Sequence, residues 1–231
     1  MTDNPGKLYL VPTPVGNLDD ITQRALKVLA EVDLVACEDT RRSGQLLSHF
    51  GLHKKKISYF EHNESRRTPQ IIAALNEGQS VAVISDGGSP GLSDPAYRLV
   101  NAAVNEDIPV EALPGATALI PALTASGLPT DRFFFEGFLP VKSGKRLRRL
   151  EQLKGYPHTL VIYESVHRIK KTLAAIAEVF GERPICLARE ISKLHEEYLR
   201  GSAGEVAAQF EDRTPKGEFV IVITGNVDEK E

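Results

Sequence analysis

Short apolar runs alternate with helical patterns along the first 113 residues of this chain. Strand-like runs lie at residues 8–11, 34–37, 57–59, 81–84 and 110–113, and helix-like segments lie at 21–30, 42–50, 69–76 and 96–105. Such alternation favours a parallel sheet, because parallel neighbours need a long crossover that is usually a helix. We therefore predict an α/β fold with a mainly parallel sheet for this half.

The pattern changes after Gly127 and then returns to strands and helices. An aromatic run at 133–135 and a basic segment at 142–149 come first. Strand-like runs follow at 159–163, 184–188, 198–201 and 219–224, with helical patterns at 167–180 and 202–210. A chain of 231 residues with 42% hydrophobic content is long enough to form two cores. We predict two coupled α/β domains, residues 1–114 and 115–231.

The bulk charge and the cysteines exclude several classes of protein. A formal net charge of -3 gives no overall attraction to nucleic acid or to an anionic membrane, so any basic surface must be local. Cys37 and Cys186 are isolated within apolar runs, which favours reduced, buried thiols over a disulfide or a metal site. No stretch approaches 18 apolar residues, and the start has no signal-peptide pattern. We expect a soluble, cytoplasmic protein.

Loops that leave the carboxyl ends of parallel strands carry ligands in sheets of this kind. Here those loops are residues 12–17, 38–41, 61–64, 85–94 and 114–117. They are rich in proline, glycine, small and polar residues, and prolines stiffen the first of them. Stiff loops with small side chains at one edge of a sheet are typical of a preformed binding cleft.

The loop at residues 85–94, SDGGSPGLSD, admits three interpretations. Its GGSPG matches the GxSxG of serine hydrolases, but Pro90 follows Ser89 and lacks the N–H that the oxyanion hole needs. A dinucleotide loop is also disfavoured, because Asp94 puts negative charge where a phosphate would lie. What remains is a loop of bare backbone for another cofactor, or a glycine-rich turn that caps a helix.

Seven motifs together resemble a known family. They are residues 11–19 (VPTPVGNLD), 37–41 (CEDTR), 85–94, 113–118 (LPGATA), 126–133 (SGLPTDRF), 135–140 (FEGFLP) and 163–168 (YESVHR). In this order they resemble the small-subunit rRNA cytidine 2'-O-methyltransferases of the tetrapyrrole methylase family. The resemblance spans roughly residues 7–225. It implies S-adenosylmethionine (SAM) as methyl donor, a cleft between two α/β domains, a homodimer, and a cytidine of 16S rRNA in the small ribosomal subunit as target.

The resemblance also implies a set of cofactor contacts. The family's SAM-binding positions fall on Pro14, Gly87, Gly88, Ser89, Leu92, Thr117, Ala118 and Glu164. Relatives usually have Ala at 87, Thr at 89, Gly at 96 and Pro at 166, so the departures here are small. Relatives also commonly carry a further C-terminal segment beyond the last strand, and its loss is expected to alter affinity or specificity if that segment holds the ribosomal subunit.

Transfer of a methyl group to a ribose hydroxyl needs alignment and a base that takes the hydroxyl proton. Glu38, Asp39 and His62 are on loops at the predicted cleft. His62 is weakly preferred as the base, because the unperturbed pKa of histidine is near 6.5. Glu38 or Asp39 would then orient the reacting groups. The alternatives are that His62 is bonded to Glu61 or Asn63, and that the acids cap the following helix. No metal site is predicted.

An RNA substrate needs basic side chains near the cleft. The candidates are Arg41, Arg42, Arg66, Arg67, Lys145 and Arg146. The alternative for each basic cluster is an ordinary solvated surface. Two rival functions remain at this level: a small-molecule tetrapyrrole methyltransferase of the same fold, which needs no basic clusters, and an RNA-binding module without catalysis.

Overall fold

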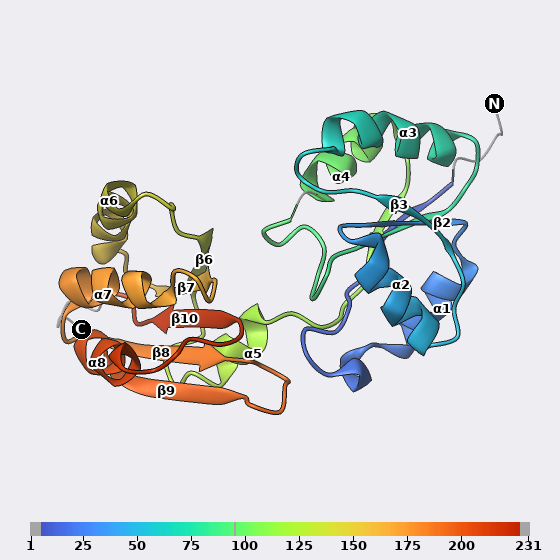
Figure 1. The fold of residues 1–231 in the computed structure, drawn as a ribbon. Coiled ribbons are helices and arrows are strands. Elements are labelled where there is room, and N and C mark those ends of the chain that lie inside the picture. The colour runs from blue at the N-terminus through green and yellow to red at the C-terminus, as the bar shows by residue number, and fades with distance from the viewer. Residues whose placement is uncertain (1–5, 95, 227–231) are drawn as a thin grey trace. The chain divides into compact units, whose positions relative to one another are not determined.

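The computed structural model describes residues 6–94 and 96–226 and divides the chain into two compact units, Met1–Thr117 and Ala118–Glu231 (Figure 1). Each unit contains a five-stranded sheet covered by helices. This confirms the predicted α/β class. Among the described residues, no helix has the length and apolar character needed to cross a bilayer.

The sheet of the first unit is parallel throughout its recorded strand pairs. Its strands are β1 (Leu8–Leu10), β2 (Leu34–Cys37), β3 (Lys55–Ser58), β4 (Val81–Ile84) and β5 (Val110–Ala112), in the order β3-β2-β4-β1-β5. The central strand β4 is buried along its whole length, as its continuous apolar sequence requires. The predicted parallel sheet is therefore confirmed for this unit.

Helices cover both faces of this sheet. The helices α1 (Gln23–Glu31) and α2 (Thr40–His49) pack on one face, and α3 (Glu64–Asn76) and α4 (Ala96–Asn105) on the other (Figure 1). Successive side chains of a strand point to opposite faces, so Val81 and Val83 join the α3 and α4 core, and Ala82 and Ile84 join the α1 and α2 core. A short 3-10 helix, η1 (Leu18–Asp20), precedes α1.

The neighbouring strands β1 and β4 are followed by chain segments that leave toward opposite faces. The loop after β1 leads to α1, and the loop after β4 leads to α4, which packs on the other face. A crevice for ligands opens where two such loops diverge at the carboxyl ends of parallel strands. Here the two loops are joined by a pair of backbone bonds, Thr13 N–H to Gly88 O at 2.9 Å and Gly88 N–H to Thr13 O at 2.8 Å.

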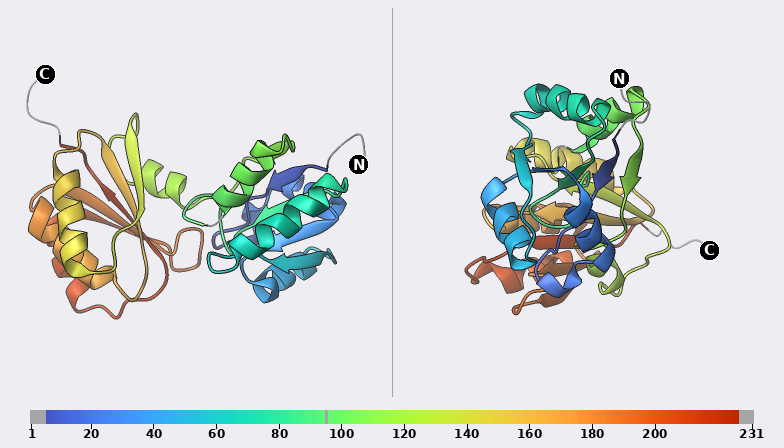
Figure 2. Two further views of the ribbon diagram at one scale, coloured as in Figure 1. Left: turned by 90° about the horizontal axis from the view of Figure 1, so that it is seen from above. Right: turned by 90° about the vertical axis from the view of Figure 1, so that its right-hand side faces the viewer.

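The second unit has a mixed sheet. Its strands are β6 (Phe133–Phe138), β7 (Thr159–Glu164), β8 (Pro184–Arg189), β9 (Glu197–Ser202) and β10 (Phe219–Ile223), in the order β6-β7-β10-β8-β9. β6 and β7 are parallel, and the other neighbours are antiparallel. The helices α6 (Ser143–Lys154), α7 (Ile169–Phe180) and α8 (Ala203–Glu211) pack on one face, and α5 (Leu119–Thr124) on the other (Figure 2).

One helix boundary in the sequence interpretation was wrong. The third helix begins at Glu64 rather than at residue 69, so Pro69 lies inside it, and the carboxylate of Glu64 is at the end of the helix where negative charge is favourable. The basic segment 142–149, for which no element was predicted, lies mostly in helix α6. The expectation for the cysteines is confirmed, because Cys37 and Cys186 are both free and buried.

Candidate functional site

Three loops of the first unit meet at the carboxyl ends of β1, β4 and β5. The bonds between Thr13 and Gly88 join the first two loops, and the Ser89 hydroxyl donates to Ala116 O at 2.9 Å to join the third. A Cβ atom built on Gly88 would lie 3.9 Å from the Cα of Thr117. Of the positions expected to contact the cofactor in this unit, Gly88, Ser89 and Thr117 are thus brought together, whereas Leu92 is 39% exposed on the same loop as Gly88.

At this junction, a side chain added at either of two glycines would be in van der Waals contact with the loop after β1. Gly88 has a φ of +95°, which L-amino acids with side chains rarely adopt, and its Cβ would lie 3.4 Å from Val15 Cγ1. A Cβ on Gly87 would lie 3.4 Å from the carbonyl oxygen of Pro14. We call this junction of residues 13–15, 87–89 and 116–117 the glycine cradle. Its bare backbone suits a cofactor that approaches the main chain closely, which agrees with the SAM site implied by the resemblance.

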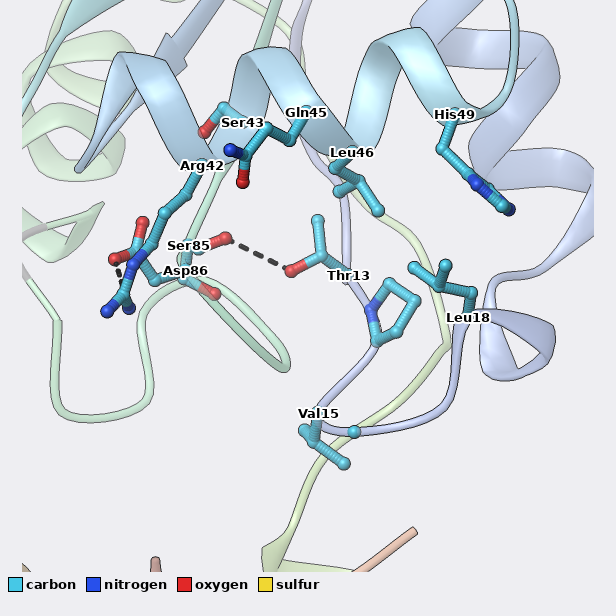
Figure 3. A pocket seen from close by; sticks show the side chains of 12 residues that line it. Thr13, Val15, Leu18, Arg42, Ser43, Gln45, Leu46, His49, Ser85 and Asp86 are labelled. Carbon is cyan, nitrogen blue, oxygen red and sulfur yellow. Dashed lines mark hydrogen bonds and ion pairs between the residues drawn. The ribbon is translucent and has the colours of Figure 1, made fainter. Parts of the chain in front are cut away.

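A pocket of about 420 Å³ lies between the loop after β1 and helix α2 (Figure 3), and we call it the α2 pocket. Arg42, Leu46 and His49 of α2 line one side and Leu18 lines another, and Pro14 is also part of the lining. An ion pair joins Arg42 Nη1 to Asp86 Oδ2 at 3.1 Å, and Thr13 Oγ1 donates to Ser85 O at 3.0 Å. The pocket therefore borders the glycine cradle through Pro14 and Thr13.

A second pocket, of about 560 Å³, lies at helices α3 and α4, and we call it the α3–α4 pocket. Its lining includes Glu38, Phe60, His62, Glu64, Tyr97 and Arg98. The carboxylate of Glu38 accepts a hydrogen bond from the backbone N–H of Asp86 at 3.3 Å. Because Asp86 precedes Gly87 directly, Glu38 links this pocket to the glycine cradle.

The structure separates the three predicted catalytic candidates. His62 and Glu38 line the same pocket, whereas Asp39 caps helix α2 by accepting from Arg41 N–H at 2.8 Å. The N–H and guanidinium of Arg41 lower the pKa of Asp39. Burial raises the pKa of Glu38, although the N–H of Asp86 opposes this. A carboxyl group whose pKa is raised toward neutrality is better matched to taking up a proton.

The basic side chains predicted to bind RNA differ in their exposure. Arg41, Arg66 and Lys145 are exposed, and Arg42 is exposed although it pairs with Asp86. Arg67 is half-buried and donates to Gln70 at 2.8 Å.

Arg146 does not fit the prediction of an RNA contact. Only 5% of it is exposed, and its Nη1 donates to Val141 O at 3.3 Å. Helix α6 turns this residue toward the core of the second unit, a placement that a run of basic residues in the sequence does not reveal. We therefore leave Arg146 out of the proposed RNA contacts.

Two predicted cofactor positions, Ala118 and Glu164, belong to the second unit. Glu164 is buried and accepts from Thr172 Oγ1 at 2.6 Å and from Ser165 N–H at 2.7 Å. It also pairs with Arg168 Nη2 at 2.8 Å. This network orders the end of β7 and the start of α7.

Sequence reasoning missed three residues that line the pockets, Tyr97, Arg98 and His49. The available signal for Tyr97 was an aromatic residue just after the glycine-rich loop.

Comparisons with known proteins identify the family of this chain. The family described as Tetrapyrrole (Corrin/Porphyrin) Methylases matches residues 7–207. The Ribosomal RNA small subunit methyltransferase I of Synechocystis sp. is 48% identical over 95% of this chain and 79% of its own length. That of Mesorhizobium japonicum is 51% identical over 94% of this chain and 74% of its own length.

A solved structure shows the same fold. The uroporphyrin-III C-methyl transferase of Thermus thermophilus, complexed with S-adenosylhomocysteine, superposes with a TM-score of 0.66 and 21% identity. The match covers 96% of this chain and 98% of the solved one. By the matched family and the identity to these relatives, the chain belongs to the tetrapyrrole methylase family and, within it, to the ribosomal RNA small subunit methyltransferase I group.

Proposed function

We propose that this protein is a SAM-dependent methyltransferase that modifies the 16S rRNA of the small ribosomal subunit. Its two named relatives carry that activity class in their names, at 48% and 51% identity. The observation that carries the proposal in the structure is the glycine cradle, where three loops present bare backbone at the carboxyl ends of parallel strands. More specifically, we propose the 2'-hydroxyl of a cytidine ribose as the methyl acceptor.

SAM supplies an electrophilic methyl group when it is bound. We propose that Pro14, Gly87, Gly88, Ser89, Leu92 and Thr117 of the first unit hold it. The solved Thermus thermophilus relative was crystallised with S-adenosylhomocysteine, which supports a donor of this chemistry. Titration calorimetry tests this step: we expect heat on adding SAM and competition by S-adenosylhomocysteine, and no heat would contradict the proposal.

We propose that a carboxylate oxygen of Glu38 takes the proton from the ribose hydroxyl. Its raised pKa, its place in the α3–α4 pocket and its bond to Asp86 beside the glycine cradle support this role. Asp39 is a weaker candidate, because its carboxylate is held by the start of α2 and by Arg41. His62 lines the same pocket as Glu38 and is the competing choice.

The two candidates are separated by matched amide variants. We expect Glu38→Gln to lower kcat by about 10² to 10⁴-fold, because a positioned base contributes that much, while His62→Gln changes kcat by much less. Both should retain SAM binding by calorimetry. The reverse order of effects would assign the proton transfer to His62.

The target is tested by incubating labelled SAM with small ribosomal subunits that lack the modification and mapping the label. Label on a cytidine ribose supports the proposal, and label on a base or none on RNA contradicts it. Exposed Arg41, Arg42, Arg66 and Lys145 are the proposed phosphate contacts, which favours RNA over a small tetrapyrrole substrate. We also propose that the protein acts in the cytoplasm as a homodimer. Sedimentation equilibrium tests the dimer directly.

A further inference from the structure

Two aromatic side chains of the α3–α4 pocket remain substantially exposed. Phe60 is 39% exposed and Tyr97 is 70% exposed, although large aromatic residues usually bury most of their surface. Phe60 follows strand β3, and Tyr97 lies in the first turn of α4. Exposed rings at a pocket are the side chains on which proteins stack the unpaired bases of RNA.

Hydrogen bonds and an ion pair hold the segments that line this pocket. The buried Asn63 side chain accepts from the backbone N–H of Phe60 at 2.9 Å and donates to Ser58 O at 3.1 Å. The buried Glu64 pairs with Arg98 Nε at 2.9 Å across α3 and α4. The volume of the α3–α4 pocket, about 560 Å³, falls within the usual range for ligand pockets, roughly 300–1,000 Å³.

The charge of the pocket selects against phosphate and for hydrogen-bond donors. Four carboxylates line it, those of Glu38, Glu61, Glu64 and Asp94, against the single guanidinium of Arg98. Negative charge repels the phosphate groups of an RNA backbone. The amino group at C4 of cytosine is a donor that Glu and Asp accept well, whereas uracil has an acceptor at the same position.

The carboxylates differ in how far they are already engaged. Glu64 pairs with Arg98, Glu38 accepts from Asp86, and Asp94 accepts from the N–H groups of Gly91 and Ala96 at 2.7 and 3.0 Å. Within residues 6–94 and 96–226, the Glu61 carboxylate has no ion pair or hydrogen bond. Glu61 is therefore the acceptor that remains available to a ligand.

We propose that the α3–α4 pocket receives the cytosine base of the target nucleotide, with its ring against Phe60 and Tyr97 and its amino group bonded to Glu61. This deepens the proposed function and rests on it. The ribose of a base in this pocket would lie toward Glu38, which adjoins the glycine cradle through Asp86. The pocket then sets which nucleotide is methylated, and the basic side chains elsewhere bind the phosphates.

Stacking is tested with variants of Tyr97, whose exposed side chain contributes little to folding. We expect Tyr97→Ala to lower kcat/KM for methyl transfer to unmodified small subunits by about 5- to 150-fold, the range measured for loss of one base stack. Tyr97→Phe keeps the ring and should stay near wild type. SAM binding by calorimetry should be equal in all three proteins. A wild-type kcat/KM for both Tyr97→Ala and Phe60→Ala would overturn the proposal.

Base selection is tested with small subunits reconstituted with uridine in place of the target cytidine. Wild type should methylate the uridine subunits poorly, and Glu61→Gln should narrow the preference for cytidine, because its amide can donate to the oxygen of uracil. An unchanged preference would remove Glu61 from the proposal. If wild type transfers no methyl group to any subunit, the proposed function itself fails. If wild type transfers normally and no pocket variant alters the transfer, only the role of the pocket fails.

Discussion

Glu38 is the residue whose titration should be visible in the stability of the protein. Burial raises its pKa, so the folded state binds this proton more tightly than the unfolded state, whose pKa is about 4.3. The contribution of Glu38 to the free energy of unfolding should therefore fall as the pH rises from about 4 through the folded pKa. Glu38→Gln removes this titration and keeps an oxygen for the N–H of Asp86. We expect the variant to exceed wild type in Tm at pH 7, with the gap closing toward pH 4. A gap that does not vary with pH would contradict this.

Gly88 and Gly91 provide a matched pair for the glycine cradle. Both have positive φ, +95° and +92°, so a side chain at either should cost about 1–3 kcal/mol of stability. Only at Gly88 would the new Cβ touch the cradle, at 3.4 Å from Val15 Cγ1, because Gly91 has no atom within 4 Å of its Cβ. We expect Gly88→Ala to weaken SAM binding by about tenfold or more and Gly91→Ala to leave it unchanged. Thermal unfolding and calorimetry measure the two effects separately, and equal SAM binding by both variants would contradict the cradle.

Helix α6 combines a basic surface with a structural ion pair. Arg149 donates to both carboxylate oxygens of the largely buried Glu136 on β6 at 2.7 Å, whereas Lys145 is exposed. We expect Arg149→Ala to lower the free energy of unfolding by about 1–3 kcal/mol, since it leaves Glu136 without its partner. Lys145→Ala should leave stability unchanged and reduce the slope of log binding constant against log salt by about 0.7–0.9. Urea unfolding and subunit binding at several salt concentrations check this, and an unaltered slope would remove Lys145 from the RNA contacts.

The elements themselves were largely predictable from the sequence. Continuous apolar runs such as β4 and the alternating helices required a parallel sheet in the first unit, and the loops at its carboxyl edge marked the cradle. What sequence could not supply was the direction of individual side chains. Arg146 has the same chemistry as Lys145, and only the turn of α6 buries one and exposes the other. That Phe60 and Tyr97 line the same pocket likewise depends on how α3 and α4 pack.

The net charge of the whole protein has a consequence for its substrate. At -3, the chain gains no general attraction to RNA, because its 28 Lys and Arg residues are offset by 31 Asp and Glu residues. A protein that bound RNA by charge alone would favour protein-free rRNA, which presents the most phosphate. This protein should instead need the folded surface of the assembled subunit to align several weak contacts at once. We expect methyl transfer to intact small subunits to exceed transfer to the same rRNA without proteins by at least about tenfold at physiological salt, measured with labelled SAM. Reconstituting that rRNA into subunits should restore the rate of methyl transfer. Equal rates with and without ribosomal proteins would instead show that recognition is local to the α3–α4 pocket and the phosphates next to the target nucleotide.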